Sequence, residues 1–168
     1  MYNKLMQESK LELVIGLGNP GTEYENTYHN VGYLFVDFLK YQLSEVPFKL
    51  LKTACYMNLS GEFVIKNLRD KSKTNTLLII HDDSDQLLGH YKITCTGSSG
   101  GHNGIQNIID QLKTENFYRL KIGIRNPEES VRKKASDFVL NKISMGDQAV
   151  LANVFEKALE DIKKQFNF

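Results

Sequence analysis

The stretch Leu11-Glu-Leu-Val-Ile-Gly-Leu-Gly-Asn-Pro-Gly21 decides the fold. It opens with an apolar run that is typical of a buried strand and breaks at a turn of glycine, asparagine and proline. The loop that follows carries Tyr24 and brings His29 to the start of a helical pattern at Val31. In an open α/β sheet, ligands usually bind just beyond the ends of the strands. We therefore expect the functional site at this turn.

The rest of the chain alternates between strand and helix patterns. Short apolar or β-branched runs predict strands, and apolar residues with a period near 3.6 predict helices. This alternation implies an α/β sandwich, in which helices flank a twisted, mixed but mostly parallel sheet. The length of 168 residues fits a single domain, 1–168, with 1–10 as a loose N-terminal extension. Beside the opening run, strands are predicted at 48–51, 76–80, 91–95 and 119–124, and helices at 31–43, 60–73, 103–113 and 147–166.

Several details of these elements are specific enough to be tested. Ser60 is predicted to cap its helix, because a serine hydroxyl can accept a hydrogen bond from the first free N–H groups. The strand at 76–80 is predicted to be buried on both faces and to end on His81-Asp82-Asp83. Alternating basic and apolar residues in 119–124 predict a strand with one exposed face. Val150 lies on the apolar stripe of the last helix, so we expect it to be buried.

The composition limits the possible functions. Apolar residues make up 41% and charged residues 24%, as in ordinary soluble proteins. No apolar run approaches the roughly 20 residues of a membrane span, and the first residues resemble no targeting peptide, so we expect a cytoplasmic protein without membrane contact. Cys55 and Cys95 are expected to be reduced thiols. Because the net charge is only +1, a nucleic-acid surface would require local clustering of basic residues.

The opening turn also satisfies the G-x-G-x-x-G fingerprint of dinucleotide-binding proteins, at Gly16 to Gly21. In that fingerprint a helix begins within the glycine turn and points its N-terminus at a pyrophosphate. Here the helical pattern begins only at Val31, and the acidic residue nearest the expected spacing, Asp37, falls inside that helix. Pro20 favours an extended Asn19, which would aim this side chain outward. A nucleotide cofactor is therefore not expected.

A histidine and an aspartate are the best candidates for chemistry. The imidazole of His29 titrates near neutrality and can accept a proton from water. Such a base needs an acceptor on its other ring nitrogen, and Asp82 follows a buried strand where it could provide one. The alternative is a surface histidine that caps the helix at Val31. We interpret Asp83 and Asp85 as solvated loop carboxylates, and without a second cluster of recognisable ligands we expect no metal. No serine lies in a G-x-S-x-G context, so water is the simplest nucleophile.

Three asparagines and a glycine-rich turn complete the predicted site. The amides of Asn19, Asn58 and Asn103 suit the binding of a peptide backbone or the polarisation of a carbonyl, although each could also serve in a turn or cap. Gly100-Gly101-His102-Asn103, at a helix start, offers backbone N–H groups to a phosphate or oxyanion. We interpret His102 as a structural residue that positions Asn103.

Five motifs, in order along the chain from about Leu11 to Lys142, resemble those of bacterial peptidyl-tRNA hydrolases. They are the opening G-L-G-N-P-G with its following tyrosine and histidine, Y-M-N-L-S-G at 56–61, H-D-D-x-D at 81–85, G-S-S-G-G-H-N-G at 97–104 and F-Y-R-L-K-I-G-I at 117–124. The resemblance implies a monomer without a cofactor. It also implies cleavage of the ester that joins a peptide to the 3′ ribose of tRNA.

The resemblance further implies roles for individual residues. His29 resembles the family's catalytic base, Asp82 the residue that stabilises its proton-accepting form, and Asn19 the asparagine that distinguishes peptidyl-tRNA from aminoacyl-tRNA. The positions that contact the 3′ end and the peptide match Tyr24, Tyr56, Met57, Asn58 and Asn103. Between the first helix and Tyr56 the chain is shorter than is usual in the family, which affects tRNA affinity and stability more than chemistry.

Phosphates of the tRNA are expected to be bound by lysine and arginine, with little base specificity. The candidates are Lys92, Arg119, Lys121, Arg125 and the run Arg132-Lys133-Lys134, although such residues also form ordinary solvated faces. Two other functions remain open. One is a non-catalytic RNA-binding relative with the same fold, and the other is a nucleotide-cofactor protein.

Overall fold

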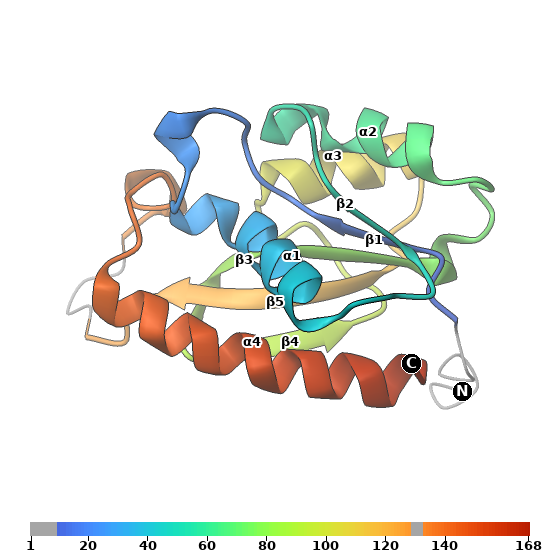
Figure 1. The fold of residues 1–168 in the computed structure, drawn as a ribbon. Coiled ribbons are helices and arrows are strands. Elements are labelled where there is room, and N and C mark those ends of the chain that lie inside the picture. Colours follow the sequence, from blue (N-terminus) through green and yellow to red (C-terminus); the bar gives the residue numbers. More distant parts are fainter. Residues whose placement is uncertain (1–9, 129–132) are drawn as a thin grey trace.

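Five strands form the central sheet of the computed structural model, which describes residues 10–128 and 133–168 (Figure 1). In spatial order they are β2 (Lys49–Lys52), β1 (Leu13–Gly16), β3 (Leu77–Leu87), β5 (Tyr118–Arg125) and β4 (Tyr91–Thr94). All neighbouring pairs are parallel except β4 and β5, which are antiparallel. The prediction of a mixed, mostly parallel sheet is therefore confirmed. Most of the predicted N-terminal extension lies outside the described residues.

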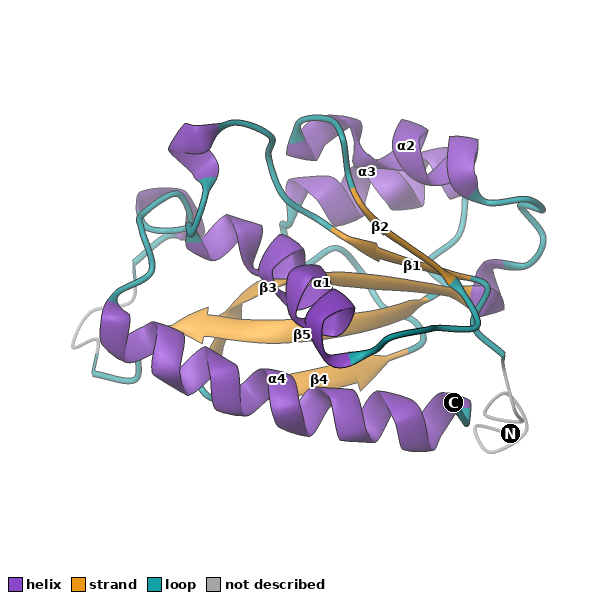
Figure 2. Ribbon diagram, in the orientation of Figure 1, coloured by secondary structure: helices purple, strands orange, loops and turns teal. Residues whose placement is uncertain are grey.

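Helices cover both faces of this sheet (Figure 2). Helices α1 (Val31–Gln42) and α4 (Met145–Phe166) pack on one face, where Phe35 contacts Phe155. Helices α2 (Ser60–Asn67) and α3 (Asn103–Leu112) cover the other face with a second apolar core, which includes Ile79 and Ile105. Short 3-10 turns occur at Thr22–Tyr24, Tyr28–Asn30, Met57–Leu59, Thr74–Thr76 and Ala135–Asp137. No helix of the described residues is long and apolar enough to cross a membrane.

Strand β3 is longer than its sequence predicts. It continues through His81 and Asp82 to Leu87, because β5 pairs with it along most of this length. In this pairing His81 lies opposite Lys121, and Asp82 lies opposite Ile122. The prediction that the strand ends on His81-Asp82-Asp83 is therefore wrong, and its polar residues belong to a hydrogen-bonded strand.

Four smaller predictions also fail. Ser60 lies inside α2, and its hydroxyl donates a hydrogen bond to the carbonyl of Met57 (2.7 Å) instead of capping the helix. Helix α2 ends at Asn67, because Leu68 is already extended. Val150 is 37% exposed, since it lies beside the buried stripe of α4. Strand β5 has no fully exposed face, because it lies between β3 and β4 and every residue in it is buried except Lys121, which is half-buried.

The sheet changes width at the carboxyl end of β1. Strand β1 pairs with β3 only as far as Gly16 and Ile80, beyond which β3 continues beside β5. The chain leaves β1 toward one edge of the sheet and leaves β3 toward the other, so a topological switch point lies here. A Cβ atom on Gly32 would lie 2.4 Å from the carbonyl oxygen of Ile80. This glycine therefore allows α1 to begin directly against β3, with His29 just ahead of it.

Candidate active site

His29 and Asp82 meet at this switch point. Nδ1 of His29 lies 3.0 Å from both carboxylate oxygens of Asp82. The N-cap of α1 is Asn30, so the alternative in which His29 caps this helix does not hold. Because a carboxylate only accepts hydrogen bonds, Nδ1 carries the hydrogen and Nε2 keeps its lone pair. Among residues 10–128 and 133–168, nothing binds this Nε2.

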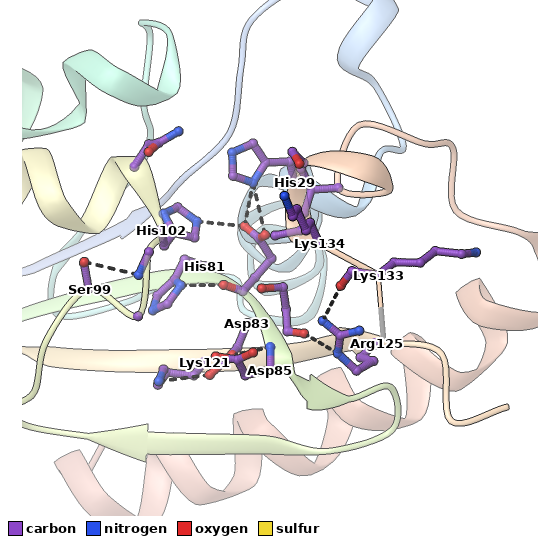
Figure 3. A pocket seen from close by; sticks show the side chains of 18 residues that line it. His29, His81, Asp83, Asp85, Ser99, His102, Lys121, Arg125, Lys133 and Lys134 are labelled. Carbon is purple, nitrogen blue, oxygen red and sulfur yellow. Dashed lines mark hydrogen bonds and ion pairs between the residues drawn. The ribbon is translucent and has the colours of Figure 1, made fainter. Parts of the chain in front are cut away.

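His102 binds the same carboxylate from another direction (Figure 3). Its Nδ1 accepts hydrogen bonds from the backbone N–H groups of Gly104 (3.1 Å) and Ile105 (3.3 Å) at the start of α3. Nε2 must then carry the hydrogen, which it donates to Asp82 over 2.9 Å. The prediction that His102 positions Asn103 is therefore corrected, since this side chain positions Asp82. It also occupies two N–H groups in the first turn of α3, the helix start that we expected to bind a phosphate or oxyanion.

Burial and neighbouring charges shift the pKa values of Asp82 and His29 in opposite directions. Asp82 is 2% exposed, and burial raises the pKa of its carboxyl, but His102 and His29 outweigh this and hold the pKa below its usual range. Burial also disfavours the protonated form of His29, but the nearby Asp82 raises the pKa of the imidazole above its usual value. The site therefore keeps a charged carboxylate beside a histidine of increased basicity.

The three side chains form a group of possible metal ligands, since one atom from each of His29, Asp82 and His102 lies within 4.8 Å of the others. A metal bound to Nε2 of a neutral His102 would require the proton on Nδ1. That position already accepts two backbone N–H groups, so a proton there would face two donors. The hydrogen-bonding pattern thus favours a proton network over a metal site.

His81 is a buried member of the cluster that sequence reasoning did not select. Its Nδ1 donates to the backbone carbonyl of Asp82 (2.6 Å), and its ring packs edge-on against His102. Burial, with the nearby His102, lowers the pKa of His81 to about 3, so the ring stays neutral. Its position next to Asp82 in the sequence was the only available signal. His81 therefore supports the strand that carries the carboxylate.

Asn19 does not point outward as predicted, and it contacts Asn30 and Met57 rather than the histidine cluster. It is 8% exposed, and its Oδ1 accepts a hydrogen bond from the backbone N–H of Met57 (2.8 Å). The carbonyl and N–H of Asn19 both bind the side chain of Asn30, a residue that sequence reasoning missed. The opening turn is thus fixed to the loop before α2 and to the start of α1.

The remaining predicted contact residues lie on two neighbouring loops. The rings of Tyr24 and Tyr56 meet edge-on with centroids 6.3 Å apart. Met57 packs against Gly104, where an added Cβ would lie 2.6 Å from its sulfur, so the 56–58 loop contacts the start of α3. Asn58 is exposed on that loop. Asn103, the first residue of α3, lines the cleft that holds His29 and Asp82.

This cleft has a volume of about 560 Å³ and is rich in basic side chains. Lys121 forms an ion pair with Asp83 (2.9 Å), which is half-buried on β3 and so is not the solvated loop carboxylate that we predicted. Asp85 is exposed, but it also lies on this strand. Lys92 is exposed on β4, directly opposite Lys121. Lys133 and Lys134 line the same cleft, whereas Arg132 lies outside the described residues.

The two arginines of β5 serve different purposes. Arg119 is 1% exposed, and its guanidinium donates to the carbonyls of Ser98 (2.9 Å) and Glu115 (3.0 Å). The prediction that it contacts phosphate is therefore corrected, because it supports the loop before α3 from inside. Arg125 lines the cleft and donates to the carbonyl of Ser84 (2.7 Å).

The loop that carries His29 is held by a segment far along the chain. The N–H of His29 donates to the carbonyl of Val139 (2.7 Å), and the N–H of Ile143 donates to the carbonyl of Asn26 (2.7 Å). Lys142 adds three bonds from its ammonium group to carbonyls of the 22–25 turn, the shortest being 2.6 Å to Glu25. These bonds fix the backbone of the His29 loop to the 139–143 segment.

Comparison with known proteins identifies close relatives of this arrangement. The family model described as peptidyl-tRNA hydrolase matches residues 13–167. The chain is 40% identical to a peptidyl-tRNA hydrolase of Sulfurihydrogenibium sp., over 90% of this chain and 89% of that protein. It is 41% identical to one from Metamycoplasma arthritidis, over 87% and 86%. A crystal structure of the Acinetobacter baumannii peptidyl-tRNA hydrolase superposes with a TM-score of 0.79 at 31% identity, covering 96% of this chain and 91% of that one.

Proposed function

The chain belongs to the peptidyl-tRNA hydrolase family, a family of hydrolases that act on ester bonds, and we propose that His29 and Asp82 carry the reaction. The substrate is peptidyl-tRNA, and the products are free tRNA and peptide. The observation that carries this proposal is the unoccupied lone pair of His29 Nε2 in a cleft, with Nδ1 bound to a buried carboxylate. We further propose that the enzyme works as a cytoplasmic monomer without a cofactor.

The proposed reaction begins with a water molecule hydrogen-bonded to Nε2 of His29. This nitrogen takes a proton from the water as its oxygen attacks the ester carbonyl carbon. Asp82 stabilises the imidazolium ion that forms, as the carboxylate does in other histidine-based hydrolases. The tetrahedral intermediate then expels the ribose hydroxyl, which receives the proton from His29. We assign the amide of Asn103, which lines the cleft, as the donor to the developing oxyanion.

The peptide side of the substrate is assigned to the asparagine and tyrosine loops. Asn19 Oδ1 is engaged by Met57, which leaves the NH₂ group of its amide to donate to a peptide carbonyl. Tyr24, Tyr56 and Asn58 are assigned to the 3′ end and the adjacent peptide. A free aminoacyl ester offers an ammonium group at this place, which cannot accept such a bond.

A turnover assay tests the function directly. N-acetyl-aminoacyl-tRNA should be converted to free tRNA and N-acetyl amino acid with multiple turnovers per protein molecule. The rival function, a non-catalytic RNA-binding relative, predicts binding of the same substrate without product. The His29–Asp82 geometry argues for the enzyme, because an RNA-binding scaffold has no need of an oriented imidazole.

Lys121, which lines the cleft, and Lys92, which lies opposite it on β4, are proposed to bind tRNA phosphates. Replacing both Lys92 and Lys121 by alanine should raise KM with little change in kcat, because these contacts form equally in the bound ground state and transition state. The slope of log KM against log salt should become shallower by about 1 per lysine. Lys40→Ala, in the last turn of α1, is the matched control. An unchanged salt slope in the double variant would exclude these lysines from phosphate binding.

His102 is proposed to adjust the basicity of the pair. In His102→Asn the shorter side chain can still cap α3, but it does not reach Asp82. Asp82 would then interact more strongly with His29 and raise the pKa of the imidazole further. Because only neutral His29 can act as a base, the acidic limb of the kcat–pH profile should move to higher pH, with kcat at neutral pH lower by about tenfold. A limb that stays in place or moves to lower pH would contradict this role.

A further inference from the structure

Asn30 holds the backbone of Asn19 at two points. The backbone N–H of Asn19 donates to Oδ1 of Asn30 (2.8 Å), and Nδ2 of Asn30 donates to the carbonyl of Asn19 (3.0 Å). Asn30 is 3% exposed and Asn19 is 8% exposed, so both bonds are shielded from water. A paired amide of this kind fixes the orientation of the residue that it binds, as well as its position.

The position of Asn30 suggests that this contact is its main purpose. Asn30 is the N-cap residue of α1, where an asparagine side chain normally accepts a hydrogen bond from the first turn of the helix. Here the side chain makes no such bond and turns to Asn19 instead. The helix thus forgoes a stabilising cap, and departures from a local rule of this kind are typical of functional sites.

The two hydrogen bonds between Asn30 and the backbone of Asn19, called the clamp below, also determine which end of the Asn19 amide is available to a ligand. With its backbone fixed by Asn30 and its Oδ1 engaged by the N–H of Met57, the amide of Asn19 cannot flip without losing a buried bond. Within the described parts of the chain nothing accepts a hydrogen bond from Nδ2 of Asn19. The NH₂ group of Asn19 is therefore held in a fixed orientation and remains available as a donor.

We propose that Asn30 is a specificity-determining positioning residue, which keeps the Asn19 amide oriented as a donor to the acyl carbonyl of an N-acylated substrate. This inference rests on the proposed role of Asn19. Without the two bonds from Asn30, the backbone of Asn19 can rotate and Oδ1 can leave the N–H of Met57. The freed oxygen would bind an ammonium group as readily as a peptide N–H. The preference for N-acylated over free aminoacyl esters would therefore depend on Asn30, although Asn30 itself contacts neither substrate.

The test compares two substrates that differ only in the N-acetyl group, an N-acetyl-aminoacyl-tRNA and the same aminoacyl-tRNA. The measured quantity is the ratio of their kcat/KM values, which cancels any general loss of active enzyme. In Asn30→Ala this ratio should fall by about tenfold, the factor that corresponds to loss of one well-aligned hydrogen bond. Thr27→Val is the matched control, because it removes a buried hydrogen bond of the same loop, to the carbonyl of Tyr24, without touching Asn19.

Asn19→Ala separates this inference from the proposed function. If Asn19→Ala and Asn30→Ala both lower the ratio while Thr27→Val does not, the inference is supported. If only Asn19→Ala lowers it, Asn30 has a structural role alone and the inference is overturned. If Asn19→Ala leaves the ratio unchanged, the proposed role of Asn19 fails, and the inference fails with it. Asn30→Gln, which retains both hydrogen-bonding groups, should recover part of the ratio if the clamp is the cause.

Discussion

His29→Ala is expected to lower kcat on N-acetyl-aminoacyl-tRNA by about 10³-fold, because a positioned general base typically contributes 10² to 10⁴ to the rate. The fold should persist, since His29 makes its side-chain bonds only to Asp82 within the described residues. Binding of tRNA should change little, because the proposed phosphate contacts lie on β4 and β5. Activity at saturating substrate and binding of uncharged tRNA are the two measurements.

A second histidine provides the control for this substitution. His90 is exposed at the turn between β3 and β4, and its hydrogen bonds to other described residues come only from its backbone, so His90→Ala should retain wild-type activity. The assignment of His29 as the base would be refuted if its alanine variant kept more than a few per cent of wild-type kcat, at a level above that of a mock preparation.

Asp82→Asn is expected to have the largest effect on the pH dependence and an effect on kcat of up to about 10⁴-fold, the size seen when the corresponding aspartate of a serine protease is replaced. The amide NH₂ would donate to Nδ1 of His29 and so favour the hydrogen on Nε2, where the base must have none. Loss of the negative charge also removes what raises the pKa of His29. The acidic limb of the residual activity should therefore move to lower pH, opposite to the shift expected for His102→Asn.

The measurement is a full kcat–pH profile of wild-type and Asp82→Asn at equal tRNA saturation. Asp110→Asn, an exposed position on α3, is the matched control and should leave both the limb and kcat in place. A displacement of the acidic limb to higher pH in Asp82→Asn would mean that the carboxylate does not act on His29 through its charge.

The sequence predicts the layers of the fold well, because apolar periodicity reports directly on burial. It also selects His29, a titratable residue in the loop between the first strand and the first helix, and Asp82, a carboxylate directly after a buried apolar run. The sequence predicts secondary structure and burial poorly where they depend on residues far away along the chain. Asp82 and Asp83 have the composition of a loop, yet pairing with β5 keeps them in a strand. Arginine is usually a surface residue, yet Arg119 is buried, because the carbonyls of Ser98 and Glu115 accept hydrogen bonds from its guanidinium group.

The roles of His102 and Asn30 were missed for the same reason. Both are short-range capping candidates by position, at the starts of α3 and α1. His102 does cap its helix, but with one nitrogen, while the other serves a carboxylate 20 residues away. Asn30 does not cap at all. Which bond a polar side chain makes depends on the neighbours that folding brings to it, and these have no signature in the local sequence.

The hydrogen bonds between the His29 loop and the 139–143 segment affect when the active site can form during synthesis of the chain. Residues 29 and 139 are joined by a backbone bond, although more than one hundred positions of chain separate them. Closing so long a loop is slow and has to await synthesis of its second half. A chain still growing on the ribosome, itself a peptidyl-tRNA, thus carries both reacting side chains long before they can be held in register. The His29 loop can therefore take its observed position only after residues 139–143 have been synthesised.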